Sequence, residues 1–246
     1  EQAGYDIHFV DDMDGDGLTE LLVGAPRYDG PGAWSGAAYL VLGSTIASGG
    51  TIDLDDSTRI MGESGLDRAG DKVQPAGDID GDGVTDLLIS APFNEEGGAK
   101  AGRVYIITGD AALTFPTLLL TDADYKFHGE NAQDQAGYSI DGDFDADGDG
   151  IADILIGAPL NDALEDESGR AYLVFGSRFS SIDDIGLSEA DVIFTCDEND
   201  AQLGASVSAE SDVDNDGLAD VLIGIPNSHA GATDSGATVL FQGEFL

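Results

Sequence analysis

The stretch DMDGDGLTELLVGAP, residues 12–26, decides the fold of this chain because it recurs three more times. The copies are DIDGDGVTDLLISAP at 78–92, DADGDGIADILIGAP at 145–159 and DVDNDGLADVLIGIP at 212–226. Each copy joins an acidic loop to a short apolar run, which is typical of a β-strand buried on both faces. The proline that closes each run has no N–H to donate to a neighbouring strand, so it ends the strand. The chain is therefore predicted to contain four tandem copies of one β-unit.

Two sets of glycines show the same period as the acidic loops. The spacings are 66, 67 and 67 residues in both sets: Gly4, Gly70, Gly137 and Gly204, and Gly36, Gly102, Gly169 and Gly236. Two landmarks that stay in step over four copies leave little room for coincidence. The 246 residues therefore form a single propeller domain or a propeller segment, with repeats at approximately 1–66, 67–133, 134–200 and 201–246.

Each unit is predicted to contain four strands, A to D in chain order. Strand A follows the first glycine, strand B follows the acidic loop, strand C follows the second glycine, and a weaker strand D closes the unit. The expected bounds are 3–10, 69–76, 136–140 and 203–208 for A; 20–26, 86–92, 153–159 and 220–226 for B; 36–43, 102–109, 169–176 and 236–243 for C; and 59–62, 125–129 and 192–196 for D. Four-stranded antiparallel sheets that stack to bury both faces favour an all-β fold, the β-propeller, over a β-solenoid with its shorter repeats.

The fourth unit is expected to lack its outer strand, because only Glu244, Phe245 and Leu246 follow Gly243. An exposed sheet edge favours pairing with another chain. Three assemblies stay open: a closed four-bladed ring, two chains that complete an eight-bladed ring, and a segment of a larger propeller.

The acidic loops carry carboxylates at positions 1, 3, 5 and 9 of a nine-residue pattern in every copy. Ca²⁺ takes about six to eight hard oxygen ligands, and a glycine at position 6 permits the sharp turn that brings them together. The carbonyl oxygen of position 7 can add a ligand, with its apolar side chain turned inward. About four Ca²⁺ ions are therefore expected. The predicted metal ligands are Asp12, Asp14, Asp16, Leu18, Glu20, Asp78, Asp80, Asp82, Val84, Asp86, Asp145, Asp147, Asp149, Ile151, Asp153, Asp212, Asp214, Asp216, Leu218 and Asp220.

An EF-hand begins in the same way but requires a bidentate Glu at position 12. Position 12 is Val23 in the first copy and isoleucine in the others, inside strand B, so the EF-hand is rejected. No catalytic constellation recurs beside the loops, and the chain is expected not to be an enzyme. The metal is expected to stabilise the fold by binding the folded loop and not the unfolded chain.

Acidity is the extreme property of the composition: 49 Asp and Glu against nine Lys and Arg give a formal net charge of −40. Nucleic acids and anionic membrane surfaces are improbable partners for such a chain, and no 18-residue apolar run predicts a membrane span. Sixteen acids lie in the four loops, so metal binding explains only part of the acidity, and adaptation to a saline habitat stays open. The single cysteine, Cys196, excludes an intrachain disulfide, which leaves metal as the staple.

These units resemble FG-GAP repeats, the blades of the integrin α-subunit β-propeller and of related bacterial calcium-binding surface proteins. Gly-Ala-Pro at 24–26 and 157–159 carries the motif, 90–92 and 224–226 depart from it slightly, and the aromatic of the "FG" position is absent. The resemblance covers the whole chain. It implies Ca²⁺ in the loops between strands A and B and an extracellular or cell-surface location. Integrin-like propellers have seven blades, whereas four are present here.

A ligand is expected on the face opposite the calcium loops, where the loops between strands B and C and between D and the next A meet. Tyr28, Trp34 and Phe93 are the candidate contacts there, because aromatic side chains anchor many protein and sugar ligands. The alternative is that these aromatic rings only cover their own loops. The favoured function is a secreted adhesion or protein-interaction module. A carbohydrate-binding propeller and an accessory domain of a larger extracellular hydrolase stay open.

Overall fold

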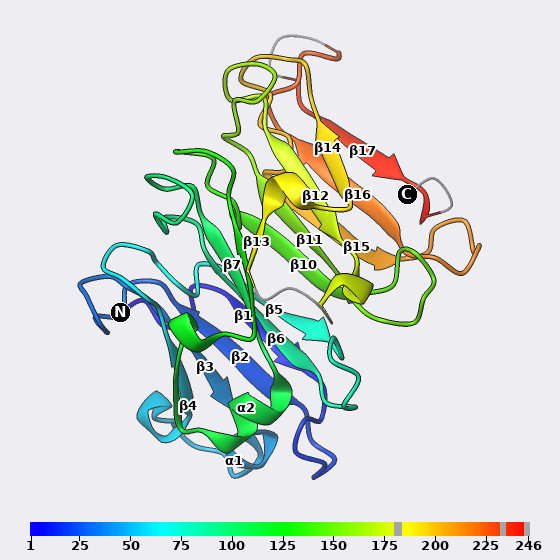
Figure 1. Ribbon diagram of the computed structural model, residues 1–246. Coiled ribbons are helices and arrows are strands. Elements are labelled where there is room, and N and C mark those ends of the chain that lie inside the picture. Colours follow the sequence, from blue (N-terminus) through cyan, green and yellow to red (C-terminus); the bar gives the residue numbers. More distant parts are fainter. Residues whose placement is uncertain (180–183, 232–234, 244–246) are drawn as a thin grey trace.

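Four β-sheets, one from each repeat, make up the structure, and the helical segments between them are short. The computed structural model describes residues 1–179, 184–231 and 235–243. Figure 1 shows the sheets following one another in chain order and packing face to face as the blades of a β-propeller. The predicted fold class, an all-β propeller with four-stranded antiparallel sheets in four repeats, is confirmed.

The antiparallel core of each sheet pairs strand A with B, B with C and C with D. The first sheet contains β1 (Ile7–Val10), β2 (Glu20–Ala25), β3 (Ala37–Val41) and β4 (Thr58–Met61). The second contains β5 (Val73–Gly77), β6 (Asp86–Ala91), β7 (Arg103–Ile107) and β9 (Tyr125–His128). The third contains β10 (Ser139–Phe144), β11 (Asp153–Ala158), β12 (Arg170–Val174) and β14 (Val192–Thr195). The fourth contains, within the described ranges, β15 (Ser206–Ser211), β16 (Asp220–Ile225) and β17 (Ala237–Phe241).

Residues 244–246, on which the expectation of a missing outer strand depends, lie outside the described residues. The helices α1 (Gly43–Ala47) and α2 (Gly109–Thr114) follow strand C in the first two repeats. Short 3₁₀ turns occupy Leu54–Asp56, Leu120–Asp122, Gly176–Arg178 and Leu187–Glu189. In the described part of the chain, no helix has the length and apolar character needed to cross a membrane.

Two further strands join neighbouring repeats, and the sequence pattern did not predict them. The strand β8 (Thr117–Leu119), from the C–D connection of the second repeat, pairs in parallel with β4 of the first sheet. The strand β13 (Asp184–Gly186) pairs in the same way with β9 of the second sheet. The C–D connections of the second and third repeats therefore each add a strand to the preceding blade and tie the two blades together through backbone hydrogen bonds.

Strand A begins later than its glycine landmark, so the predicted first residues of this strand are wrong. Gly70 adopts a left-handed conformation with φ of +79°, outside regular β-strand geometry, and β5 begins three residues later. A Cβ at this position would lie 2.2 Å from the carbonyl oxygen of Ala37 in the previous sheet. The period at Gly70 therefore reflects a turn at which two blades touch, and glycine is needed because no larger residue fits.

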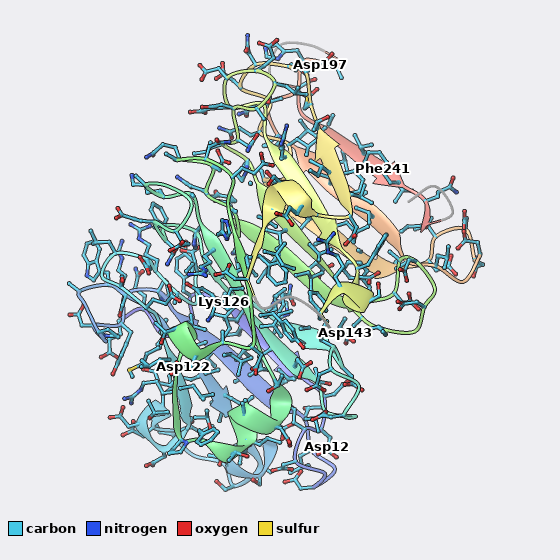
Figure 2. The ribbon with its side chains drawn as sticks, viewed as in Figure 1. Asp12, Asp122, Lys126, Asp143, Asp197 and Phe241 are labelled. Carbon is cyan, nitrogen blue, oxygen red and sulfur yellow. The ribbon has the colours of Figure 1, made fainter. Side chains whose placement is uncertain are left out.

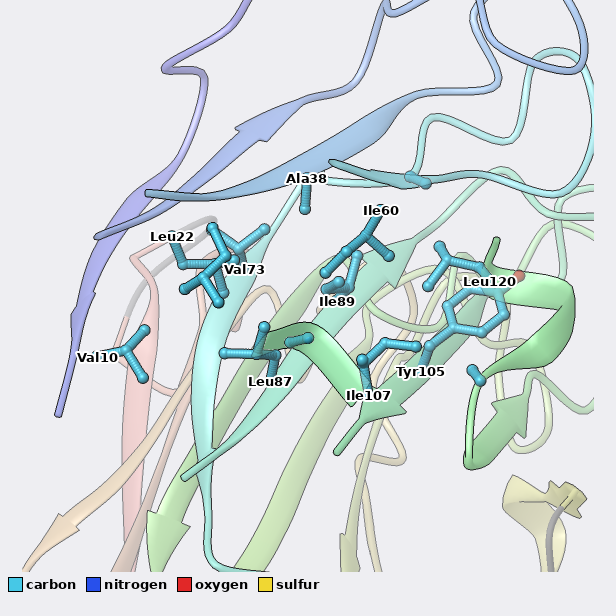
Figure 3. Packing of buried hydrophobic residues seen from close by; sticks show 14 of the residues in the cluster. Val10, Leu22, Ala38, Ile60, Val73, Leu87, Ile89, Tyr105, Ile107 and Leu120 are labelled. Atoms are coloured by element: carbon cyan, nitrogen blue, oxygen red, sulfur yellow. The ribbon is translucent and has the colours of Figure 1, made fainter. Parts of the chain in front are cut away.

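The core lies between the sheets. Leu22 and Leu40 are paired neighbours in the first sheet, are at most 1% exposed, and belong to one buried cluster with Leu87 and Ile89 of the second. Figure 3 shows Leu22, Leu87 and Ile89 in this cluster. Comparable clusters fill the next two interfaces. Strand B of the second and third sheets is thus buried along its whole length, as its continuous apolar run predicts.

A buried polar network also joins the second and third blades. The Asn161 amide donates to the Asp134 carboxylate over 2.7 Å and to the Tyr172 hydroxyl over 3.4 Å, while Arg170 pairs with Glu130 over 2.7 Å. Burial raises the pKa of Asp134 to about 6. The same contacts recur one repeat earlier with Asp67, Asn94, Tyr105, Arg103 and Glu63.

Candidate metal centres

The four acidic loops connect strand A to strand B at the same end of all four sheets. Figure 2 marks Asp12 in the first of them, at the lower tip of the molecule. The position-1 carboxylate organises each loop: Asp12 accepts hydrogen bonds from the backbone N–H groups of Gly15 and Gly17 over 2.9 and 2.8 Å. The second and third loops repeat this arrangement from Asp78 and Asp145. The turn is therefore closed by its own aspartate.

Position 4 of the loop takes a left-handed conformation in every copy. It is glycine three times, and Asn215 takes its place in the fourth loop with φ of +63°. Asparagine tolerates this conformation better than most residues. The substitution therefore preserves the shape of the loop.

The position-9 carboxylate is the most enclosed group of each loop. Asp153 is fully buried at the start of β11 and accepts two backbone hydrogen bonds of 2.8 Å, one from Ala146 in its own loop and one from Gly176 after strand C. Glu20, Asp86 and Asp220 make the equivalent pair of bonds. This side chain therefore links the acidic loop to the end of strand C in all four blades.

Sequence reasoning placed the position-9 carboxylate only as a metal ligand and missed this second role. A signal was present, because a glycine follows position 9 by 23 residues in each repeat, from Gly43 to Gly243. A Cβ on Gly176 would lie 2.3 Å from the carbonyl oxygen of Ala152. The glycine therefore lets the chain approach closely enough for its N–H to reach Asp153.

The structure brings the carboxylates of positions 1, 3 and 9 together in every loop. Their nearest oxygens lie within 4.8 Å of one another in each cluster, and position 5 joins them only in the first loop, as Asp16. The clusters are Asp12, Asp14, Asp16 and Glu20; Asp78, Asp80 and Asp86; Asp145, Asp147 and Asp153; and Asp212, Asp214 and Asp220. In all four loops the position-5 carboxylate accepts the N–H of position 7, as Asp82 does from Val84 over 2.7 Å.

The position-7 side chains do not all turn inward. Val84 packs against the core between the first two sheets, as expected, but Leu18 is 40% exposed, so the expectation is wrong for Leu18. The first loop lies at the outer end of the stack, where no preceding sheet among the described residues covers it. Whether the carbonyl oxygens of Leu18, Val84, Ile151 and Leu218 are ligands stays a prediction.

Burial and mutual repulsion both disfavour the charged clusters without a cation. Burial, opposed by the two backbone hydrogen bonds and reinforced by the neighbouring carboxylates, raises the pKa of Asp86 and of Asp153 to about 7. Burial and then the nearby carboxylates also raise the pKa of Asp80 and Asp147. A divalent cation would relieve this cost, because an opposite charge favours ionised carboxylates.

The donor set fits a hard divalent cation. Every cluster contains carboxylate oxygens alone, with neither nitrogen nor sulfur ligands, and Asp80 and its equivalents keep one side open to solvent. Four such clusters at the same turn of four stacked sheets define a β-propeller whose interstrand loops carry all-oxygen donor sets suited to a divalent cation.

The FG-GAP repeat model matches residues 3–41, 70–107, 136–174 and 203–241, more than half of the chain. The chain belongs to the FG-GAP repeat family. It is 31% identical to integrin alpha-PS2 of Drosophila melanogaster over 174 residues, which is 67% of this chain and 12% of that protein. It is 32% identical to integrin alpha-IIb of Homo sapiens over 167 residues, 64% of this chain and 15% of that protein.

Phosphatidylinositol-glycan-specific phospholipase D of Bos taurus is similar to the same extent, with 31% identity over 169 residues, 67% of this chain and 19% of that protein. The chain therefore spans less than a fifth of the length of each of these three relatives.

The predicted ligand contacts lie in loops that meet at the other end of the sheets. Trp34 is 42% exposed and lies under the Arg27 guanidinium, 5.1 Å from the ring centre. Two cations lie over the Phe93 ring, Arg68 at 4.1 Å and Lys100 at 5.8 Å from its centre. Cations therefore already cover both rings.

Tyr28 is placed differently. Its ring is half-buried against Tyr39, and its hydroxyl accepts a hydrogen bond from Arg59 over 3.2 Å. This geometry ties Tyr28 to the outer face of the first sheet.

Proposed function

We propose that this chain is a calcium-stabilised, non-catalytic protein-interaction module of a secreted or cell-surface adhesion protein. The observation that carries the proposal is the fourfold repetition of one buried carboxylate, held by two backbone N–H groups, inside an all-oxygen cluster. Similarity to integrin α-subunits supports the adhesion role and the extracellular location.

Calcium is the proposed cation, with about four ions per chain. A cation that binds only the folded chain contributes about 2.7 kcal/mol per site at a hundred times its Kd. The clusters contain three or four carboxylates each, so the bound charge also reduces repulsion within a chain whose net charge is −40. Calcium would therefore replace the disulfides that a chain with one cysteine cannot form.

A second candidate function is an accessory domain of a larger extracellular hydrolase. The similarity to a phospholipase D favours it, because the matched repeats cover only 19% of that protein. Carbohydrate binding through Trp34 and Tyr28 receives less support, because Arg27 and Arg59 lie over these rings, where a sugar would have to stack.

Self-association is also part of the proposal. Leu222 and Leu240 are paired neighbours on the fourth sheet and are 41% and 45% exposed, whereas the equivalent pair Leu22 and Leu40 is buried against the second sheet. On the first sheet, Ile7 and Phe9 are 56% and 71% exposed. Two apolar sheet faces of this kind can pack against each other across two chains.

Thermal melting of the chelator-treated protein, followed by calcium addition, tests the central claim. We expect the midpoint to rise with calcium, and with magnesium to a smaller extent, because Mg²⁺ dehydrates reluctantly. An unchanged midpoint on adding calcium would refute calcium stabilisation. A binding isotherm that saturates far below four ions per chain would refute the stoichiometry.

A further inference from the structure

The few basic side chains of this acidic chain divide into two groups. Lys126 donates to the backbone carbonyl of Thr121, and four arginines pair with carboxylates: Arg59, Arg103, Arg170 and Arg178. The remaining four have no ion pair within 4.0 Å to any residue of the described ranges. They are Arg27, Arg68, Lys72 and Lys100. A chain with 49 acidic residues does not need these four basic side chains for solubility, so their presence calls for another explanation.

Each of these four cations lies over an aromatic ring. Arg27 lies over Trp34, Arg68 and Lys100 lie over Phe93, and Lys72 lies 5.9 Å from the centre of the Tyr5 ring. We call the four cations and three rings the basic patch.

The basic patch is continuous across the first two repeats. The Arg68 N–H donates to the Trp34 carbonyl over 3.2 Å, so the loop that carries Arg27 and Trp34 touches the loop that carries Arg68. A cavity of about 80 Å³ lies between Arg27 and Arg68, with Tyr5 and Asp71 in its wall. Two guanidinium groups and one carboxylate leave this cavity with one net positive charge.

The fold does not require basic residues at these positions. Arg68 has a left-handed backbone with φ of +59°, and the equivalent Gln135 of the next repeat has φ of +54°. Lys100 has φ of +55°, and its equivalent Glu167 has φ of +45°. The same backbone conformation therefore accepts a neutral or an acidic residue one repeat later. Folding does not require the positive charges of Arg68 and Lys100, which leaves a role in ligand binding.

We propose that the basic patch binds an acidic peptide segment of a partner protein, with a carboxylate in the cavity between Arg27 and Arg68. The inference rests on the proposed role as a protein-interaction module. The Arg27 and Arg68 guanidinium groups lie over rings, which accept no N–H bond in the ring plane, and a planar guanidinium can make a bidentate bond to a carboxylate. The cavity has several times the roughly 10–15 Å³ that one water needs, so a carboxylate fits.

Charge complementarity also selects the acidic partner. The remaining surface is dominated by carboxylates and would repel an acidic segment, so such a segment is expected to bind at the basic patch. A neutral sugar would gain little, because stacking on Trp34 or Phe93 requires displacement of a cation that already covers the ring.

Fluorescence anisotropy with a labelled glutamate-rich peptide tests the proposal on the calcium-loaded chain, at an ionic strength of about 0.15 M. The double variant Arg68→Gln, Lys100→Glu introduces the residues that the third repeat holds at the same positions. We expect it to weaken binding about tenfold or more. The matched control Lys126→Gln removes a positive charge elsewhere and is expected to change the affinity less than about twofold.

Three results would overturn the proposal. The first is that the unmodified chain does not bind the peptide, and the second is that Lys126→Gln weakens peptide binding as much as the double variant does. The third is that a uronic-acid oligosaccharide binds more tightly than the peptide and that its binding requires Arg68 and Lys100. The last result would assign the basic patch to a polysaccharide. Thermal melting of the same samples distinguishes failure of this inference from failure of calcium stabilisation. If calcium raises the melting temperature of the unmodified chain but the chain binds no peptide, only the inference about the basic patch is refuted.

Discussion

Replacement of Asp153 by asparagine tests the structural role of the position-9 carboxylate. Asparagine keeps the shape and one oxygen, but its amide group would face the N–H of either Ala146 or Gly176, each now 2.8 Å from a carboxylate oxygen. One buried N–H thus loses its acceptor, which costs about 1–3 kcal/mol. Loss of the buried charge offsets part of this cost. We expect Asp153→Asn to destabilise the metal-free chain by about 2 kcal/mol, or about 4–8 °C in midpoint for a chain of this size.

Calcium separates the two roles of Asp153. If this carboxylate is also a ligand, the variant loses the stabilisation of one site, about 2.7 kcal/mol more at a hundred times the Kd. The gap in midpoint between variant and unmodified chain should therefore roughly double when calcium is added.

The assay is thermal denaturation followed by circular dichroism, with chelator and with calcium. Asp122→Asn is the matched control, because it makes the same chemical change at an exposed aspartate away from the loops (Figure 2). If Asp153→Asn and the control Asp122→Asn have the same melting midpoint in chelator, the structural role of the Asp153 carboxylate is refuted. A gap that stays constant on adding calcium would show that Asp153 is a structural link and not a ligand.

Three further predictions concern the sheets and their junctions. The folded chain holds a proton on Asp134 up to about pH 6 that the unfolded chain loses near 3.8, so this group makes stability fall as pH rises between these values. Asp134→Asn should make the fall in the urea midpoint of the metal-free protein less steep over this range, and an unchanged slope contradicts the assignment. Gly102→Ala should lower the free energy of unfolding by about 3 kcal/mol or more, because the new Cβ would lie 2.2 Å from the carbonyl oxygen of Ala136. The control Gly49→Ala lies in open space with φ of +71° and should cost only about 1 kcal/mol. Equal urea midpoints for the two variants would rule out the steric argument. Serine at both Leu222 and Leu240 should reduce self-association in sedimentation velocity without lowering the melting midpoint, and an unaltered association constant would exclude this face.

The sequence by itself determined the repeat, the acidic loops and strands B and C. These features depend on local patterns: the continuous apolar run from Leu21 makes a strand buried on both faces, and the proline at residue 26 ends it in any context. The carboxylates of the acidic loops lie within nine residues of one another, so their convergence could also be predicted from spacing alone.

Only the tertiary structure decided how neighbouring repeats join. The parallel strand β8 is three residues long and has no period of its own; it is defined by its pairing with β4, some 58 residues earlier in the chain. The pairing of the Asp153 carboxylate with Gly176, and the gathering of Arg27, Arg68 and Lys100 around Trp34 and Phe93, likewise join segments that are separate in the sequence. The physical reason is that local patterns specify which residues each strand buries, whereas the stacking of the blades decides which loops meet.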